Sequence, residues 1–288
     1  MSRSFLFVPA DSERKLEKAR ASNADALIID LEDSVAPESK PAARALVARF
    51  LGEADGGEYW VRINPLDTSD SLEDLKAVVP AGPSGIVLPK PESAHDANQL
   101  AKLLEVLEHE SGLEFGSTRI LPIVTERPSA LFRLHDYADA TPRLGGLTWG
   151  AEDLAAELGA TANRDERGNW LPVYELARSL CRLAAAAAGV PAIDTVFTDF
   201  GNPDGLAQYA KAARRDGFEG MLAIHPAQVE AINSAFMPTA EEVRRAERIV
   251  VLFDENPEAG ALALDGQMID RPHLVQARKI LDSADKYQ

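Results

Sequence analysis

The chain has 288 residues, with 30 Lys+Arg against 46 Asp+Glu, a formal net charge of -16 and 45% hydrophobic residues. This composition is typical of a soluble globular protein, large enough for one barrel-sized domain or two ordinary ones. The acidic excess argues against a nucleic-acid partner, because phosphate binding needs a basic surface. The one cysteine, Cys181, excludes an intramolecular disulfide framework and is expected to be a buried, inert thiol. No segment approaches the ~18 unbroken apolar residues of a membrane span, and we expect a cytoplasmic protein.

Short apolar runs alternate with segments of helical periodicity, as parallel βα units require. The strands predicted from these runs are 4–8, 26–30, 59–63, 85–89, 119–124, 146–149, 193–197 and 220–224. The helices predicted between and after them are 12–22, 37–51, 71–78, 94–111, 128–137, 153–158, 172–188, 205–216 and 226–236. Eight such units predict a (β/α)8 barrel over residues 1–237. A doubly wound open sheet is the alternative, but no Gly-x-Gly-x-x-Gly follows a strand.

Residues 238–288 exceed what the barrel needs. Thr239 and Glu242 form a capping-box pattern at the start of a helix over 239–254. A break at 256–260, a turn at Asp265-Gly266 and a last helix from Arg271 follow. We predict a C-terminal helical extension that packs on a neighbouring subunit or covers a site.

Polar residues gather where the predicted strands end. In this fold the active site lies at the carboxyl ends of the strands, so these residues converge on one rim. The segments concerned are 30–33, 62–65, 89–90, 125–126 and 150–153.

Glu126 and Asp153 end two neighbouring strands and offer one carboxylate each. Mg2+ is held by one or two carboxylates and keeps positions open for water and substrate oxygens. The alternative is that both acids only favour helix N-termini through the macrodipole. The recurrence of acids at several strand ends favours the metal site.

Asp30, Glu32 and Asp33 cannot all point inward, because side chains alternate along a strand. Glu32 or Asp33 would hold a metal-bound water in one interpretation. In the other, Asp33 and Ser34 only cap the turn before Pro37. The residues alone leave both open.

Arg62 and Lys90 bring positive charge to the same rim, and we assign both, with Asn64, to substrate binding. A guanidinium suits a carboxylate or an enolate oxygen. A salt bridge to the nearby acids is the alternative, stronger for Lys90 than for Arg62. His225, at the end of the last strand, is expected to be structural. No serine triad, cysteine pair or Walker loop is present in the sequence.

Together these segments closely resemble the HpcH/HpaI aldolase/citrate lyase β-subunit family, and within it the CitE-like branch that includes malyl-CoA and citramalyl-CoA lyases. The resemblance runs from Arg3 to about Leu281, in order along the chain. The segments that carry it are 3–10, 29–35, 61–65, 88–90, 150–154 and 224–229.

The resemblance implies a barrel that uses Mg2+ to cleave a carbon–carbon bond reversibly in a 3-hydroxyacyl thioester, yielding a 2-oxo acid and an acyl thioester. It also implies these roles: metal ligands Glu126 and Asp153; substrate and enolate binding by Arg62; metal-bound water on Glu32 and Asp33.

The segment 265–270 resembles the family's Gly-x-Met-Ile-Asp motif. Its last aspartate, in CoA-dependent relatives, reaches an adjacent subunit's active site. Asp270 is therefore the candidate acid/base, and a plain N-cap at Arg271-Pro272 is the equal alternative. The resemblance implies a homo-oligomer, a trimer or a hexamer.

Other functions stay open. The alternatives are a CoA-free class II pyruvate aldolase, a malyl-CoA-type thioesterase, and a subunit of a citrate lyase complex that acts only on an acyl carrier protein. The acyl-CoA or acyl-carrier substrate and the 2-oxo acid are not specified further.

Overall fold

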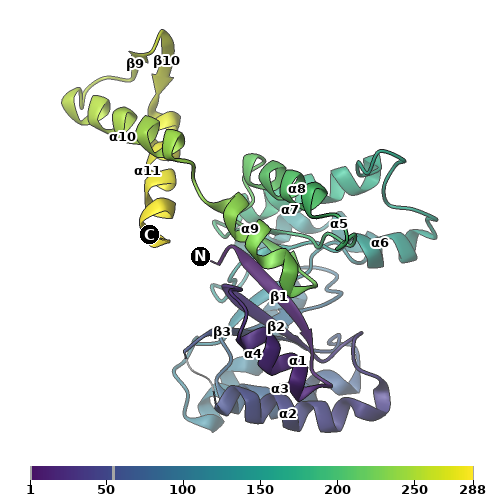
Figure 1. Cartoon of the computed structure of the whole chain (residues 1–288). Helices are drawn as coiled ribbons and strands as arrows, with labels where there is room; N and C mark the ends of the chain where they lie inside the picture. The colour runs from purple at the N-terminus through teal and green to yellow at the C-terminus, as the bar shows by residue number, and fades with distance from the viewer. Residues whose placement is uncertain (1, 54–55, 288) are drawn as a thin grey trace. The chain divides into compact units, whose positions relative to one another are not determined.

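The structure, a computed structural model, describes residues 2–53 and 56–287. The chain divides into two compact units, Met1–Ala235 and Phe236–Gln288, each of which we describe by itself. Figure 1 labels many of the elements of both. In the part of the chain that the structure describes, no helix is long and apolar enough to cross a membrane.

The first unit is built on an eight-stranded sheet with the order β5-β4-β3-β2-β1-β8-β7-β6. Its strands are β1 (Ser4–Pro9), β2 (Ala26–Asp30), β3 (Glu58–Arg62), β4 (Gly85–Leu88), β5 (Arg119–Pro122), β6 (Leu147–Thr148), β7 (Ala192–Asp194) and β8 (Gly220–Ala223). All the paired strands are parallel. Parallel bridges Ile120↔Leu144 and Ile123↔Thr148 join β5 to the β6 region, so the sheet closes on itself. The predicted (β/α)8 barrel is confirmed.

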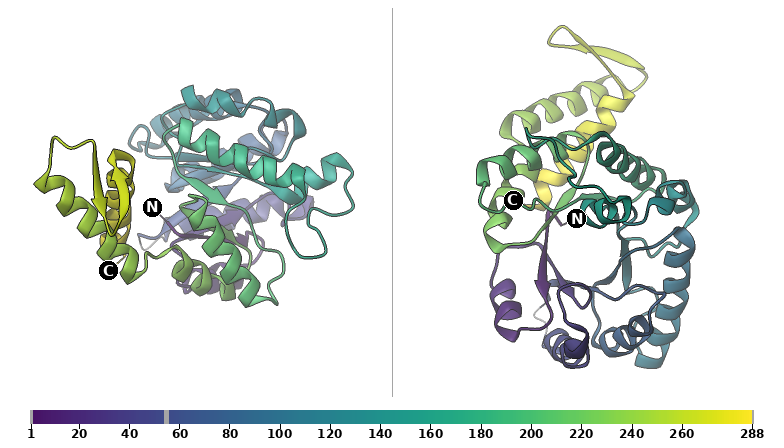
Figure 2. Two further views of the ribbon diagram at one scale, coloured as in Figure 1. Left: turned by 90° about the horizontal axis from the view of Figure 1, so that it is seen from above. Right: turned by 90° about the vertical axis from the view of Figure 1, so that its right-hand side faces the viewer.

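Helices surround these strands in the right-hand view of Figure 2. They are α1 (Glu13–Arg20), α2 (Lys40–Gly52), α3 (Ser69–Val78), α4 (Ala94–Ser111), α5 (Pro128–Leu131), α6 (Ala151–Leu158), α7 (Pro172–Ala187), α8 (Pro203–Arg215) and α9 (Val229–Phe236). Short 3-10 turns η1 (Pro37–Ser39), η2 (Val79–Ala81), η3 (Leu134–Asp139) and η4 (Pro226–Gln228) complete the connections. The predicted helix over 128–137 is the main difference, because it breaks into α5 and η3.

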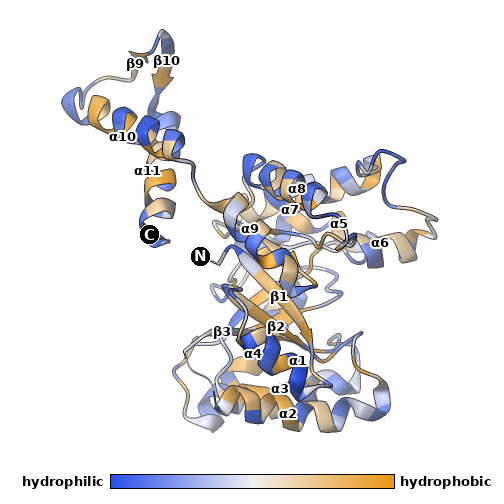
Figure 3. Ribbon diagram, in the orientation of Figure 1, coloured by the Kyte–Doolittle hydropathy of each residue, from blue (hydrophilic) through white to orange (hydrophobic). Residues whose placement is uncertain are grey.

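The distribution of polar and apolar residues explains why the strands form the inner layer of this unit and the helices its outer layer. All five residues of β2 are buried, whereas α1 buries only Leu16 and Ala19. Figure 3 accordingly shows hydrophobic colour along β1 and hydrophilic colour on much of α1. The helices thus cover the barrel and turn their charged faces outward.

Trp60 fills the amino-end half of the barrel interior. A Cβ atom on Gly85, the first residue of β4, would lie 2.3 Å from the Trp60 ring, and one on Gly145 would lie 2.6 Å from it. Glycine at these two positions gives the indole its space. Because this half of the interior is packed, a ligand can enter only at the carboxyl ends of the strands.

The second unit has its own small core. It contains α10 (Ala240–Glu255), β9 (Ala261–Leu264), β10 (Gln267–Asp270) and α11 (Arg271–Lys286). The predicted Thr239–Glu242 capping box is present at α10. The predicted turn is the tip of a hairpin in which Asp265 and Gly266 both have positive φ, 52° and 76°, as a two-residue turn of this type requires. The prediction missed the two strands that flank this turn.

Candidate functional site

A cavity of about 320 Å³ opens at the carboxyl ends of the strands. Its lining includes Asp30, Arg62, Glu126 and Asp153 beside apolar side chains from several strands. Three of the side chains predicted to converge on one rim, Arg62, Glu126 and Asp153, therefore lie at the same cavity.

Arg62 is held by the strand register. Asp30 and Arg62 are Cα partners on β2 and β3, so their side chains point the same way. Arg62 Nε and Nη2 each donate to Asp30 at 2.7 Å, and Nη1 lies 3.1 Å from Glu32 Oε2. Burial pushes the pKa of Asp30 upward, but its bonds to Arg62 outweigh this effect and the pKa is lowered. Asp30 is therefore an ionised anchor for the guanidinium.

Glu32 lies between the two cations of the rim. It is buried, and its Oε1 accepts from Lys90 Nζ at 2.7 Å. Burial raises the pKa of Glu32, and the charges of Arg62 and Lys90 offset only part of that rise. Asp33 lies at the outer edge, 57% exposed, with Lys90 Nζ at 3.4 Å. Both acids thus contact Lys90.

Glu126 approaches the cavity from the loop after β5, and Asp153 approaches it from the first turn of α6. Glu126 is only 2% exposed, and Gly150 makes room for it, since a Cβ there would lie 2.9 Å from Glu126 Cγ. Thr125 Oγ1 contacts both the carbonyl and the amide of Gly150, at 3.2 and 3.1 Å. These contacts tie the end of β5 to the start of α6, whose first turn carries Asp153.

The environment of Glu126 suits a cation. Its pKa is raised well above the ordinary value of 4.5, first by burial and then by the charges of Asp153 and Glu32. Two carboxylates that line an open cavity fit a hard divalent ion that keeps water and substrate oxygens as further ligands. Among the described residues no group of three or more His, Cys, Asp or Glu side chains is arranged to hold a metal.

Asn64 holds the backbone beneath the rim. Its side-chain amide donates to Leu31 O at 3.1 Å and to Asp74 Oδ2 at 2.7 Å, and its Oδ1 accepts from Lys40. The amide is thus engaged with protein groups. Its predicted part in substrate binding stays a prediction.

Asp270 belongs to the second unit. It precedes α11 in a capping box with His273, whose Nδ1 lies 2.5 Å from Asp270 Oδ1. The capping alternative is thus present, and the carboxylate remains 36% exposed. His225 Nδ1 accepts from Ala227 N at 3.2 Å at the start of η4, which is the structural role expected for it.

Several cavity residues were not predicted. Trp149, Thr195 and Ile224 line the cavity, and Trp149 Nε1 is fixed by a 2.7 Å bond to Asp194 Oδ1. All three lie at the ends of strands. The same strand-end rule that found the acids covers these three positions, the polar Thr195 as well as Trp149 and Ile224.

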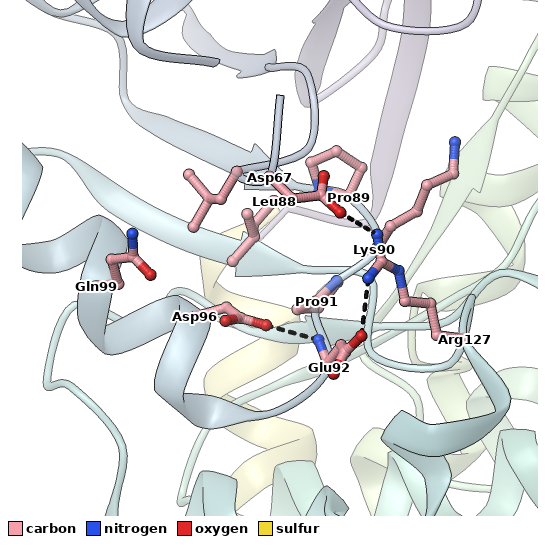
Figure 4. Close-up of a pocket in the computed structure, with 10 residues that line it drawn as sticks. Asp67, Leu88, Pro89, Lys90, Pro91, Glu92, Asp96, Gln99 and Arg127 are labelled. Carbon is pink, nitrogen blue, oxygen red and sulfur yellow. Dashed lines mark hydrogen bonds and ion pairs between the residues drawn. The ribbon is translucent and has the colours of Figure 1, made fainter. Parts of the chain in front are cut away.

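A second pocket, lined in part by Lys90, lies next to this cavity (Figure 4). Arg127 spans it, donating from Nη2 to Asp67 at 2.8 Å and from Nη1 to Glu92 at 2.9 Å. The side chain of Lys90 leads away from these pairs. Arg127 therefore links three loops next to Glu126.

The profile of the HpcH/HpaI aldolase/citrate lyase family matches residues 3–226. The chain belongs to this family. The resemblance to this family that the sequence motifs indicated is thereby confirmed.

Relatives in the family match the chain over nearly its whole length. The citrate lyase subunit beta of Haemophilus influenzae is 36% identical, over 99% of this chain and 97% of the relative. A (3S)-malyl-CoA thioesterase of Cereibacter sphaeroides is 35% identical, over 98% and 94%. Among solved structures, CitE of Mycobacterium tuberculosis in complex with magnesium, acetoacetate and coenzyme A has a TM-score of 0.81 at 34% identity, covering 98% of each chain.

Proposed function

We propose that this protein is a Mg2+-dependent lyase that cleaves, or forms, a carbon–carbon bond in a 3-hydroxyacyl thioester of the citryl-, malyl- or citramalyl-CoA type. The observation that carries the proposal is the pair Glu126 and Asp153 at the cavity beside Arg62. The magnesium and coenzyme A in the related CitE complex support it. We also infer a cytoplasmic homo-oligomer.

The bond changes define what the residues must do. In cleavage the 3-hydroxyl loses its proton, the C2–C3 bond breaks, and C3 becomes the carbonyl carbon of the 2-oxo acid. The bonding electrons pass to the thioester fragment as an enolate, which takes a proton at C2. Mg2+, when bound, supplies Lewis-acid stabilisation of the negative charge on substrate oxygens.

The chain's own residues meet these needs in distinct ways. Glu126 and Asp153 would hold the ion, and Glu32 with Asp33 would orient water beside it. Arg62 would stabilise the enolate oxygen through Nη1, which is not bonded to Asp30 and lies 3.1 Å from Glu32 Oε2. Lys90 and Asn64 complete the proposed substrate-binding set.

Asp270 is the proposed acid/base, acting on the site of a neighbouring subunit. We expect Asp270→Ala to lower kcat by about 10²- to 10⁴-fold, with unchanged Mg2+ affinity because Asp270 is not one of the proposed ligands. Mixing it with Glu126→Gln tests the neighbour's role: each variant alone is inactive, and mixed oligomers regain activity. No recovery after proven subunit exchange, or a fully active monomer, would refute action between subunits.

The pH dependence of metal binding follows from Glu126. Because its pKa is raised in the fold, the folded chain binds this proton more tightly than the unfolded chain, and the contribution of this group to stability is lost as pH rises from 4.5 through the raised value. Mg2+ must displace the same proton. We therefore expect calorimetry to show Mg2+ affinity rising with pH across this window.

A thioesterase is the second candidate, favoured by the similarity to the Cereibacter sphaeroides protein. The experiment is an assay of the purified protein against a panel of acyl-CoA substrates with product analysis. A lyase yields a 2-oxo acid and an acyl-CoA, whereas a thioesterase yields a hydroxy acid and free CoA. Activity only on free 4-hydroxy-2-oxo acids would indicate the CoA-free aldolase, and activity only with an acyl carrier protein the complex subunit.

A further inference from the structure

Three acids of the rim, Glu32, Glu126 and Asp153, form what we call the acid cluster. Lys90 contacts this cluster through both its backbone and its side chain. Its backbone N–H donates to Glu126 Oε2 at 2.6 Å. Its ammonium lies 2.7 Å from Glu32 Oε1 and 3.4 Å from Asp153 Oδ1. One residue thus contacts both proposed metal ligands, one through the main chain and the other through the side chain.

The backbone of Lys90 is held in an uncommon conformation. Its φ of 49° lies in the left-handed region, which a residue with a side chain adopts at a cost and which is concentrated at functional sites. Lys90 comes two residues after the end of β4, and its N–H points at Glu126. The main-chain contact therefore does not depend on where the ammonium points.

The two cations of the rim differ in freedom. Arg62 is locked by its two bonds to Asp30 and is 12% exposed. Lys90 is 24% exposed, and its ammonium is a point charge on a flexible four-carbon stem. The Lys90 ammonium can therefore move while the bond from the Lys90 N–H to Glu126 stays in place.

We propose that the Lys90 ammonium is an exchangeable counter-ion, which neutralises the acid cluster without metal, yields Asp153 to the divalent ion, and then binds a carboxylate of the 2-oxo acid. This proposal rests on the proposed function. A divalent ion bonds a carboxylate oxygen at about 2.1 Å, and the ammonium now lies 3.4 Å from Asp153 Oδ1. Like charges this close repel, so the two cations compete for that oxygen.

The test measures two binding constants with opposite expected signs. In Lys90→Met, calorimetric titration with Mg2+ is expected to show binding tightened by about tenfold, because one repelling charge is gone. Titration of pyruvate at saturating Mg2+ is expected to show binding weakened by about tenfold, since the carboxylate loses its partner. Lys90→Arg keeps the charge and should stay within about threefold of the wild type for Mg2+.

Lys90→Gly guards against a folding artefact, because glycine accepts the left-handed backbone and keeps the N–H to Glu126. It should reproduce both shifts of Lys90→Met. Unchanged or weaker Mg2+ binding in the folded charge-removing variants would overturn the proposal, as would unchanged pyruvate binding. A wild type that binds no divalent ion would instead sink the proposed function, so the two failures are distinguishable.

Discussion

Glu126→Gln and Asp153→Asn are each expected to lower Mg2+-dependent kcat/KM by at least about a thousandfold, which corresponds to roughly 4 kcal/mol of lost transition-state stabilisation. The reason is that Glu126 and Asp153 are the two carboxylates we propose as ligands, so an amide in either place would replace one of the two proposed carboxylate ligands with a neutral group. Steady-state kinetics at ordinary Mg2+ measures the effect, and calorimetry should show the accompanying loss of Mg2+ binding.

The fold is expected to survive these changes. Glu126 is buried with a raised pKa, and the neutral glutamine has the same shape and can still accept from Lys90 N. Glu105→Gln on the exposed side of α4 is the matched control and should leave kinetics and melting temperature unchanged. Full turnover by either ligand variant would contradict the assignment.

Arg62→Ala is expected to damage both stability and activity. It leaves the carboxylate of Asp30 buried without its bidentate partner, and breaking a buried pair costs about 3–5 kcal/mol. For a chain of this size we expect a melting temperature lower by about 10 °C. Activity should fall by about a thousandfold or more, because the enolate loses its charged partner.

The two effects of Arg62 can be separated. In Arg62→Ala with Asp30→Asn, the unpaired charge is gone, so the melting temperature should recover in part while activity stays low. Arg62→Lys keeps the charge but lacks the fork that spans both oxygens of Asp30, and it should recover only part of each property. If the double variant regained activity, Arg62 would be a structural residue rather than a catalytic one.

The fold was predictable because its signals are local. Each βα unit carries a short buried strand such as Ala26–Asp30 and a helix with clear periodicity. The β9–β10 hairpin was missed because its strands contain Ala and Gln, are partly exposed and only four residues long each. Residues of this kind carry little β-propensity, and pairing with a neighbour determines their conformation.

The site was predictable in part for the same reason. The strand-end rule identified Arg62, Glu126 and Asp153 from sequence alone. It could not identify the Asp30–Arg62 pair, which depends on the β2–β3 register. Nor could it show that Asn64 is engaged by Asp74, because that contact depends on how α3 packs.

The most direct measurement of the central claim is the stoichiometry of products from malyl-CoA and citramalyl-CoA, with Mg2+ and with a chelator. We predict a 2-oxo acid and acetyl-CoA in equal amounts when Mg2+ is present, and neither product when it is removed. Cleavage that persists undiminished in the chelator, or release of free CoA with no 2-oxo acid, would contradict Mg2+-dependent carbon–carbon bond cleavage by this protein.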